Sequence, residues 1–352
     1  MVDMSPLERQ VTQEEISAAL EHRREQGAGL SFWDVAMPLG VFAVLVVIFW
    51  NIVDMFALHA ANDVGWSRRF LFPALMGITV LGLVGSVAAA PVRWWRRRRR
   101  EGTLLAFARA NNLAYRPSVS GRPPALHATV LKQGDRQRAI DLLHRQGDTI
   151  HPGKLWATGN YRWTVEGGED SSDSNYDLWF ATWRLPRRMP QVIIDYKDLA
   201  RDSTAVATHG HQRSQQLSFG EPFDSHFRVL APQGLQRDVF QLMPPHVLQR
   251  IMTDLPPGWD AEIVGDQFTV FTGRCQPVES PDLWRSLERL EQGLVQDLCR
   301  LSARMVDSRA REVQAFSYGG AVLKKRRFGA WTLRSAASFL VGMVLMYLFI
   351  FH

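Results

Sequence analysis

The chain has 352 residues and a formal net charge of +6, a balance that would suit a nucleic-acid-binding protein. The excess positive charge, however, lies in two short clusters: Arg93 with Arg96–Arg100, and Lys324–Arg327 with Arg334. Without those eleven side chains, 30 Lys and Arg face 35 Asp and Glu, and residues 101–323 hold 25 basic and 26 acidic residues. No basic face is then large enough to follow a phosphate backbone, which argues against nucleic acid as a partner.

The first 31 residues are polar and lack the charged-then-apolar layout of a cleavable signal peptide. Within them, "VTQEEISAALEHRREQGAG" predicts a short helix. Thr12 and Glu15 have the spacing of a capping box, and Gly27 and Gly29 are suited to end the helix.

Three long apolar runs predict transmembrane helices, at residues 32–58, 70–92 and 328–352. The second run has no charged residue between Phe70 and Val92, and about 20 apolar residues are enough to cross a bilayer as a helix. The first run contains Asp54. A carboxylate inside the bilayer would indicate a function, whereas one in the outer headgroup region would not.

The stretch "WWRRRRRE" follows the second run directly, and "KKRR" precedes the third. Lys and Arg beside a span are retained in the cytoplasm, so we expect the intervening segment to be cytoplasmic. Anionic lipid attracts such clusters by about 1 kcal/mol per residue, and we favour lipid contact over a specific recognition site. The predicted lipid contacts are Arg93, Arg96, Arg97, Arg98, Arg99, Arg100, Lys324, Lys325, Arg326 and Arg327.

A cytoplasmic α+β domain is predicted for residues 101–279. The run "EGTLLAFARANNLAYRP" predicts a helix that ends at Asn111–Asn112. Alternation of bulky apolar and polar residues predicts strands in "KLWATGNYRWTVE", "YDLWFATWRL", "QVIIDY", "QQLSF" and "HFRVL". Helices and strands alternate without a strict βαβ rhythm, so we expect an α+β domain and not a doubly wound sheet.

The next segment, residues 231–273, predicts a helix to Leu242 and a second helix that begins at Pro244–Pro245. We then expect a turn at residues 256–258 and a hairpin that turns at Gly265–Asp266.

A long helix and basic linker are predicted for residues 280–327. From Asp282 to Ser308, leucines recur at helical spacing and form one apolar stripe. The stripe could pack on the domain or form a helical seam between chains. The residues considered for helix–helix contact are Asp54, Leu287, Leu290, Leu294, Leu298 and Leu301.

The common catalytic motifs are absent: the chain has no phosphate loop, dinucleotide fingerprint, HExxH or GxSxG, and no metal spacing around its two cysteines. We therefore expect no cofactor, no metal and no catalytic residue. A histidine general base is the alternative, with His209, His211 and His226 as candidates. "FDSHF" contains Asp, Ser and His, but a triad requires groups that converge from separate segments.

At "FDSHFRVLAPQGLQRDVFQLMPPHVLQRIM" the chain resembles a family of uncharacterised bacterial membrane proteins, catalogued as domain of unknown function 3137. The matching positions are Phe223, Phe227, Val229, Arg237, Leu242, Pro244 and Leu248, with "DQFTVF" as the closing strand. Family members similarly place two apolar spans before the domain, so the terminal third run is a departure. The resemblance implies structural roles for these residues and no activity.

Together these features predict a multi-pass protein of the bacterial inner membrane with its soluble domain in the cytoplasm. Arg outnumbers Lys by 36 to 5, which favours a GC-rich bacterial genome. We expect a membrane-anchored binding or scaffold protein that contacts anionic lipid and another membrane protein or a second copy of itself. The alternative is a lipid-proximal hydrolase or other enzyme with a histidine general base.

Overall fold

The computed structural model describes residues 2–26, 92, 94–121, 123, 126–132, 134–145, 151–165, 174–197, 216–232 and 235–304. They fall into two compact units, which we call the helical unit, Asp3–Asn111, and the sheet unit, which begins at Asn112. The predicted domain start at residue 101 falls inside a helix, because residues 94–110 are helical. The boundary between the two units lies instead at Asn111–Asn112.

The helical unit contains α1 (Ser5–Glu8), α2 (Gln13–Glu25) and the helical residues 94–110. The predicted capping box at the start of α2 is confirmed. The backbone N–H of Glu15 donates to Thr12 Oγ1 at 3.3 Å, and the N–H of Thr12 donates to Glu15 Oε2 at 2.8 Å. The later helix ends at Ala110 as predicted, and Asn112 takes a positive φ of 52° just beyond it.

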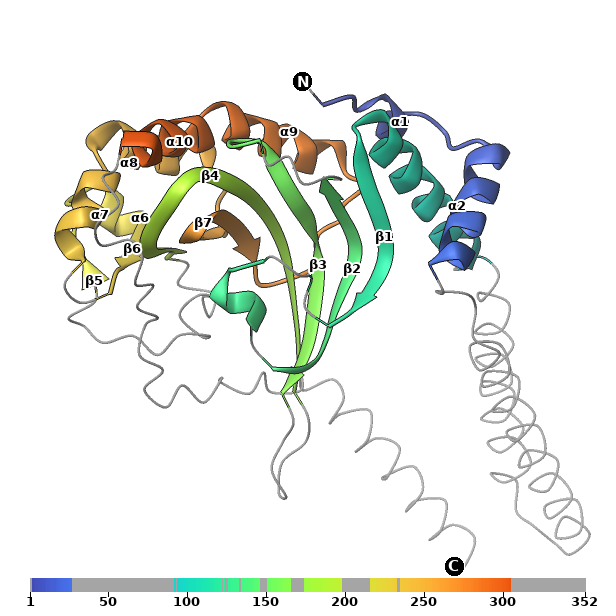
Figure 1. Ribbon diagram of the computed structural model, residues 1–352, viewed down its shortest axis with the longest axis horizontal. Coiled ribbons are helices and arrows are strands. Elements are labelled where there is room, and N and C mark those ends of the chain that lie inside the picture. Colours follow the sequence, from blue (N-terminus) through green and yellow to red (C-terminus); the bar gives the residue numbers. More distant parts are fainter. Residues whose placement is uncertain are drawn as a thin grey trace, which may run out of the picture. The chain divides into compact units, whose positions relative to one another are not determined.

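Seven strands form one sheet in the order β1-β2-β3-β4-β6-β5, and β7 pairs with β4 away from this path. The strands are β1 (Leu113–Ser120), β2 (Asp135–Arg145), β3 (Leu155–Val165), β4 (Ser174–Tyr196), β5 (Gln216–Leu217), β6 (Phe227–Leu230) and β7 (Asp260–Thr272). Each pair of neighbouring strands is antiparallel. Figure 1 shows the sheet bending strongly along β4.

Two sequence predictions about strand ends are wrong. The runs "YDLWFATWRL" and "QVIIDY" belong to one strand, β4, and the expected hairpin at Gly265–Asp266 lies inside the continuous strand β7. Between the pairs Arg184↔Gln267 and Met189↔Gly265 the register shifts, and β4 has the extra residues. Gly265 has φ +60°, which serves this irregularity and not a turn.

Helices lie against one face of the sheet (Figure 1). They are α6 (Phe223–His226), α7 (Gln236–Leu242), α8 (Pro245–Asp254), α9 (Pro281–Gln292) and α10 (Leu294–Arg304). The helices predicted up to Leu242 and from Pro244–Pro245 are confirmed by α7 and α8. The single long helix predicted from Asp282 is wrong, because the chain breaks at Gly293 into α9 and α10.

The other face of the sheet packs on residues 126–132, which include the short 3-10 helix η1 (Thr129–Lys132). Val130 and Leu131 are fully buried there, and Tyr161 of β3 donates from its hydroxyl to the carbonyl of Leu131 at 2.9 Å. This core includes apolar residues from five strands, among them Leu142, Trp163, Phe180, Ile193, Leu230 and Phe271. Alternation along the strands therefore directs one set of side chains to η1 and the other to the helices.

The predicted fold class, an α+β domain joined to three transmembrane helices, needs correction. The structure shows a seven-stranded antiparallel sheet with helices. Within the described ranges, no helix is long and apolar enough to cross a membrane. The helical residues 94–110 include exposed tryptophans and arginines among their first residues. The predicted spans at 32–58, 70–92 and 328–352 lie outside the described residues, apart from Val92.

Candidate functional site

Two exposed tryptophans lie at the N-terminal end of the helical residues 94–110, which the structure describes together with the helical Val92. Trp94 and Trp95 are 46% and 47% exposed. The guanidinium carbon of Arg98 lies 3.5 Å from the ring centroid of Trp94, and that of Arg99 lies 4.6 Å from Trp95. Both pairs are four residues apart, the spacing that brings side chains together on a helix. Arg96, between the two pairs, is also exposed. We call these five residues the Trp–Arg cluster: Trp94, Trp95, Arg96, Arg98 and Arg99.

Arg97 is not part of the Trp–Arg cluster, because its side chain pairs with Glu101. Its Nε lies 3.1 Å from Glu101 Oε1, and Arg23 Nη1 of α2 lies 2.7 Å from the same oxygen. Glu101 is only 4% exposed, so this shared ion pair holds α2 against the later helix. The two helices approach closely at Gly102, where an added Cβ would lie 3.1 Å from Val11 Cγ2 and 3.4 Å from the Cα of Ile16.

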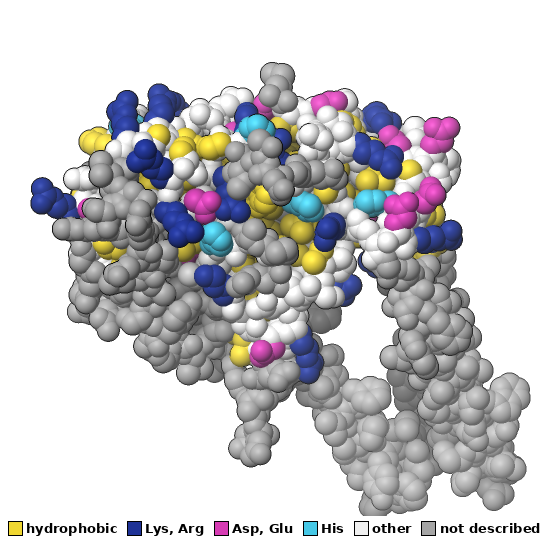
Figure 2. Space-filling model, in the orientation of Figure 1, with side chains coloured by type: hydrophobic (Ala, Val, Ile, Leu, Met, Phe, Trp, Pro, Cys, Tyr) yellow, Lys and Arg dark blue, Asp and Glu magenta, His cyan; other side chains and the backbone are white. Residues whose placement is uncertain are grey.

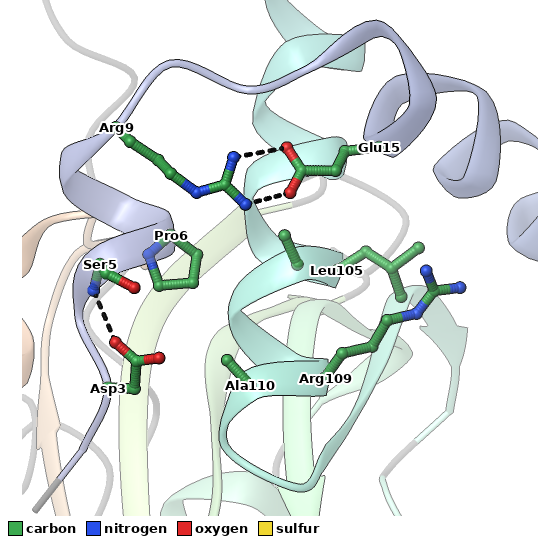
Figure 3. A pocket seen from close by; sticks show the side chains of 9 residues that line it. Asp3, Ser5, Pro6, Arg9, Glu15, Leu105, Arg109 and Ala110 are labelled. Atoms are coloured by element: carbon green, nitrogen blue, oxygen red, sulfur yellow. Dashed lines mark hydrogen bonds and ion pairs between the residues drawn. The ribbon is translucent and has the colours of Figure 1, made fainter.

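A hollow of about 310 Å³ lies elsewhere in the helical unit (Figure 3). Arg9 and Glu15 face each other across one side of it, with Arg9 Nη1 3.3 Å from Glu15 Oε2, while Asp3 accepts from the N–H of Ser5 at 3.0 Å. Burial raises the pKa of Glu15, but the Thr12 N–H and Arg9 outweigh it and hold the pKa below its ordinary value. Arg9 thus pairs with Glu15 and Asp3 with Ser5, while Arg109 also lines the hollow.

In the sheet unit, three side chains from separate segments form a chain of contacts. His127 Nδ1 lies 3.3 Å from Asp266 Oδ1, and Arg184 Nη1 donates to Asp266 Oδ2 at 2.6 Å. Burial lowers the pKa of His127; Asp266 opposes this, whereas the positive charges of Arg184, Lys132 and Arg188 add to it. The imidazole is therefore mainly neutral at neutral pH, and Asp266 mainly neutralises Arg184.

Among the residues that the structure describes, Asp195 on β4 is the carboxyl group with the strongly raised pKa. It is 1% exposed, and its Oδ1 has no hydrogen-bond partner among the described residues. Its Oδ2 lies 3.9 Å from Arg228 Nη1 on β6. Burial raises the pKa of Asp195 from 3.8 to about 7, and Arg228 and Lys197 oppose the rise only in part.

Apolar side chains also reach the surface of the sheet unit. Phe240 of α7 and Met252 of α8 are 48% and 37% exposed, and the ring centroid of Phe240 lies 5.0 Å from that of Phe219. We call Phe219, Phe240 and Met252 the apolar surface residues. On the face shown in Figure 2, basic and acidic side chains are interspersed.

The histidine candidates do not form a catalytic group within the described ranges. His226 Nδ1 lies 2.8 Å from Ser225 Oγ and 3.1 Å from the carbonyl of Pro222. Asp224 instead accepts from the N–H groups of Phe219 and Gly220, so the Asp-Ser-His sequence forms the short helix α6 and not a triad. His209 and His211 lie outside the described residues.

The leucines considered for helix–helix contact are buried or partly buried within the chain itself. Four of them are at most 2% exposed, and Leu301 is partly buried. The four buried leucines are Leu287, Leu290, Leu294 and Leu298. Because α10 packs against β4, the stripe meets the sheet of the same chain. The predicted positions that lie outside the described residues are Asp54, Arg93, Lys324, Lys325, Arg326 and Arg327.

Sequence reasoning missed the contact of His127, Asp266 and Arg184. These residues are far apart in the chain, and only the pairing of β4 with β7 and the docking of residues 126–132 bring them together. A lone histidine after "RPPAL" gives no pattern that would have pointed to this contact.

The chain has little detectable similarity to known proteins. No family model matches the chain, and no curated protein matches it. Among solved structures, the chain is similar to the crystal structure of the mycobacterial trehalose monomycolate transport factor A, TtfA. The identity is 10% and the TM-score 0.36, over 58% of this chain and 94% of that one. A likeness at this level carries no argument about function, and the resemblance to the domain of unknown function 3137 stays a prediction.

Proposed function

We propose that this protein is a membrane-associated binding or scaffold protein that the Trp–Arg cluster holds against anionic lipid. The observation that carries the proposal is the exposure of Trp94 and Trp95, each stacked by an arginine four residues on. Tryptophan favours the headgroup level of a bilayer, where its ring is partly apolar and partly polar. Arginine beside it adds attraction to anionic headgroups.

The apolar surface residues support the binding part of the proposal. Aromatic and methionine side chains at the surface are enriched in protein contacts. Phe240 and Met252 are exposed on α7 and α8, which follow each other in the chain. The ring of Phe219, which follows β5, contacts the ring of Phe240. We infer that the sheet unit uses this surface to contact another membrane protein or a second copy of the chain.

Lipid binding can be tested by flotation of the purified full-length chain with vesicles. Phosphatidylcholine vesicles would be compared with vesicles that also contain phosphatidylglycerol, at low and high salt. The triple variant Arg96→Gln, Arg98→Gln, Arg99→Gln removes three charges worth about 1 kcal/mol each, so we expect about a hundredfold weaker partitioning to the anionic vesicles. Trp94→Ala with Trp95→Ala should weaken binding to both vesicle types.

Arg162→Gln with Arg285→Gln is the matched control, because both arginines are exposed and each pairs with a nearby aspartate. It should bind as the unchanged protein does. Equal binding to neutral and anionic vesicles, or full binding by the triple variant, would refute the lipid role of the cluster.

The binding role needs a separate experiment. Purification in mild detergent followed by crosslinking mass spectrometry should show a stoichiometric partner linked near α7 and α8. Phe240→Asp should abolish that crosslink and leave flotation unchanged. A monomer without a partner in the unchanged protein would overturn the scaffold proposal.

A further inference from the structure

In the helical unit, α2 and the helical residues 94–110 run in opposite directions. Glu15, near the start of α2, lines the same hollow as Arg109, whereas Arg23, near the other end of α2, lies 2.7 Å from Glu101. Figure 1 accordingly shows α2 ending at the end of the unit where the residues that precede Glu101 lie. The two helices therefore share one end, at which the chain leaves α2 and enters the later helix.

At this end, apolar and basic side chains lie in successive layers along the helix and not on opposite faces of it. Val92, Trp94 and Trp95 are exposed, and the five arginines 96–100 follow them directly. Because a helix makes one turn in 3.6 residues, the five arginines point to all sides of it. Two of them stack on the tryptophans and so close the apolar side after one turn. A helix that lies flat on a bilayer has instead one apolar and one charged face along its length.

The end of α2 adds positive charge at the same level. Arg23 and Arg97 both contact Glu101 Oε1, at 2.7 and 3.1 Å, and Arg24 is the next residue of α2. Burial lowers the pKa of Arg98; Glu101 opposes this, and the positive charges of Arg23 and Arg24 add to it. Residues 21–26 and 96–101 together contain seven arginines and three glutamates, a net charge of +4. This charge is suited to an anionic surface.

We propose that α2 and the helical residues 94–110 stand upright on an anionic bilayer, with Trp94, Trp95 and the end of α2 at the lipid headgroups. The inference rests on the proposed lipid contact of the Trp–Arg cluster, and it adds the orientation of the helical unit and a second contact, Arg24. Residues 27–91, which contain two long apolar runs, join the unit at this same end.

Labels at matched positions test the orientation. Val92 and Ala110 are both exposed and are 18 residues apart, so they lie on the same side of the helix, about 27 Å from each other along its axis. Glu14 and Glu25 are exposed on α2 and are eleven residues apart, so they lie on nearly the same side at about 16 Å. A flat helix would bring both members of a pair equally close to lipid, whereas an upright helix brings only one.

Each of these four positions would be changed to Cys and labelled with a fluorophore in the full-length chain with Cys275→Ser. Cys299 stays in place, because burial raises the pKa of its thiol to about 11 and it reacts slowly. The vesicles contain phosphatidylcholine and phosphatidylglycerol, with a nitroxide quencher on the headgroup. The labels at Val92→Cys and Glu25→Cys should lose most of their fluorescence, and those at Ala110→Cys and Glu14→Cys should keep it.

The contribution of α2 is measured with a second pair of variants. Arg24→Gln should weaken binding to the anionic vesicles about fivefold and leave binding to phosphatidylcholine unchanged. Arg109→Gln is the matched control, because Arg109 is exposed at the opposite end of the unit, and it should bind as the unchanged protein does.

Equal quenching within either pair of labels would overturn the upright orientation, and unchanged binding by Arg24→Gln would overturn the contact through α2. Both results leave the lipid role of the Trp–Arg cluster standing if the triple arginine variant still loses binding. Full binding by that triple variant would instead refute the proposed function, and the orientation with it.

Discussion

The carboxylate of Asp254, the last residue of α8, occupies the space that a Cβ on Gly293 would need. The same carboxylate accepts from the N–H of Leu294 at 3.2 Å, which caps the first turn of α10. The break between α9 and α10 is thus fixed by a residue about 40 positions earlier. Beyond the break, α10 packs against β4.

We expect Gly293→Ala to lower the free energy of unfolding by about 1–3 kcal/mol, because the added methyl group collides with Asp254. Urea denaturation measures this effect. Gln292→Ala, next to it and exposed, is the control and should stay within about 0.5 kcal/mol. In a chain that already contains Asp254→Ala, Gly293→Ala should cost less; an equal cost in both backgrounds would show that the collision is not the cause.

Asp195 predicts a pH dependence of stability. Its pKa is about 7 in the folded chain and near 3.8 when unfolded, so the folded state binds its proton more tightly. The contribution of Asp195 to stability is therefore most favourable below pH 4 and is lost as the pH rises from about 4 to about 7. Above that range the loss, on the order of a few kcal/mol, stays constant.

Asp195→Asn should remove this decline and make the protein more stable than the unchanged chain at pH 8. Denaturant unfolding from pH 4 to pH 8 gives the comparison. Asp224→Asn is the opposite control: hydrogen bonds from Ser218, Phe219 and Gly220 overcome the effect of burial and hold the pKa of Asp224 below its ordinary value. Its contribution is present above the unfolded pKa, near 3.8, and is lost as the pH falls. Parallel curves for Asp195→Asn and the unchanged protein would contradict the raised pKa.

The shared ion pair of Glu101 predicts unequal effects of its two arginines. The side chain of Arg23 is 18% exposed and that of Arg97 is 60% exposed. Arg23→Gln should destabilise the helical unit by about 1–3 kcal/mol, since it weakens a partly buried charged contact. Arg97→Gln should cost about 1 kcal/mol at most, because water screens that pair. Hydrogen exchange of the α2 amides reports both effects, and equal acceleration by the two variants would contradict the assignment.

Gly102 permits the close approach of α2 to the later helix. Gly102→Val should separate them and cost about 1–3 kcal/mol, because Val11 and the backbone of α2 already lie at contact distance from an added Cβ. Limited proteolysis of the helical unit should become faster. Ala110→Val, exposed at the end of the same helix, is the control. Unchanged proteolysis of Gly102→Val would mean that the helices do not need the glycine.

Local patterns were enough to predict several elements. The capping box of Thr12 and Glu15, the helix end at Asn111–Asn112 and the start of α8 after Pro244 depend on residues close in sequence. The single strand β4 was not predicted, because an exposed proline, Pro186, and two exposed arginines, Arg187 and Arg188, lie in the middle of it. That interruption has the composition of a turn, but β7 pairs with β4 on both sides of it, up to Arg184 and again from Met189.

The sequence by itself determined where the charge lies, which helices have caps and which runs are apolar, because these properties depend on composition and short spacing. The tertiary structure decided that the leucine stripe packs on the sheet of its own chain, that Gly265 serves a bulge, and that His127 meets Asp266. Each of these outcomes depends on contacts between segments far apart in the chain. Pairing and packing energies select such contacts, and no local pattern of residues records them.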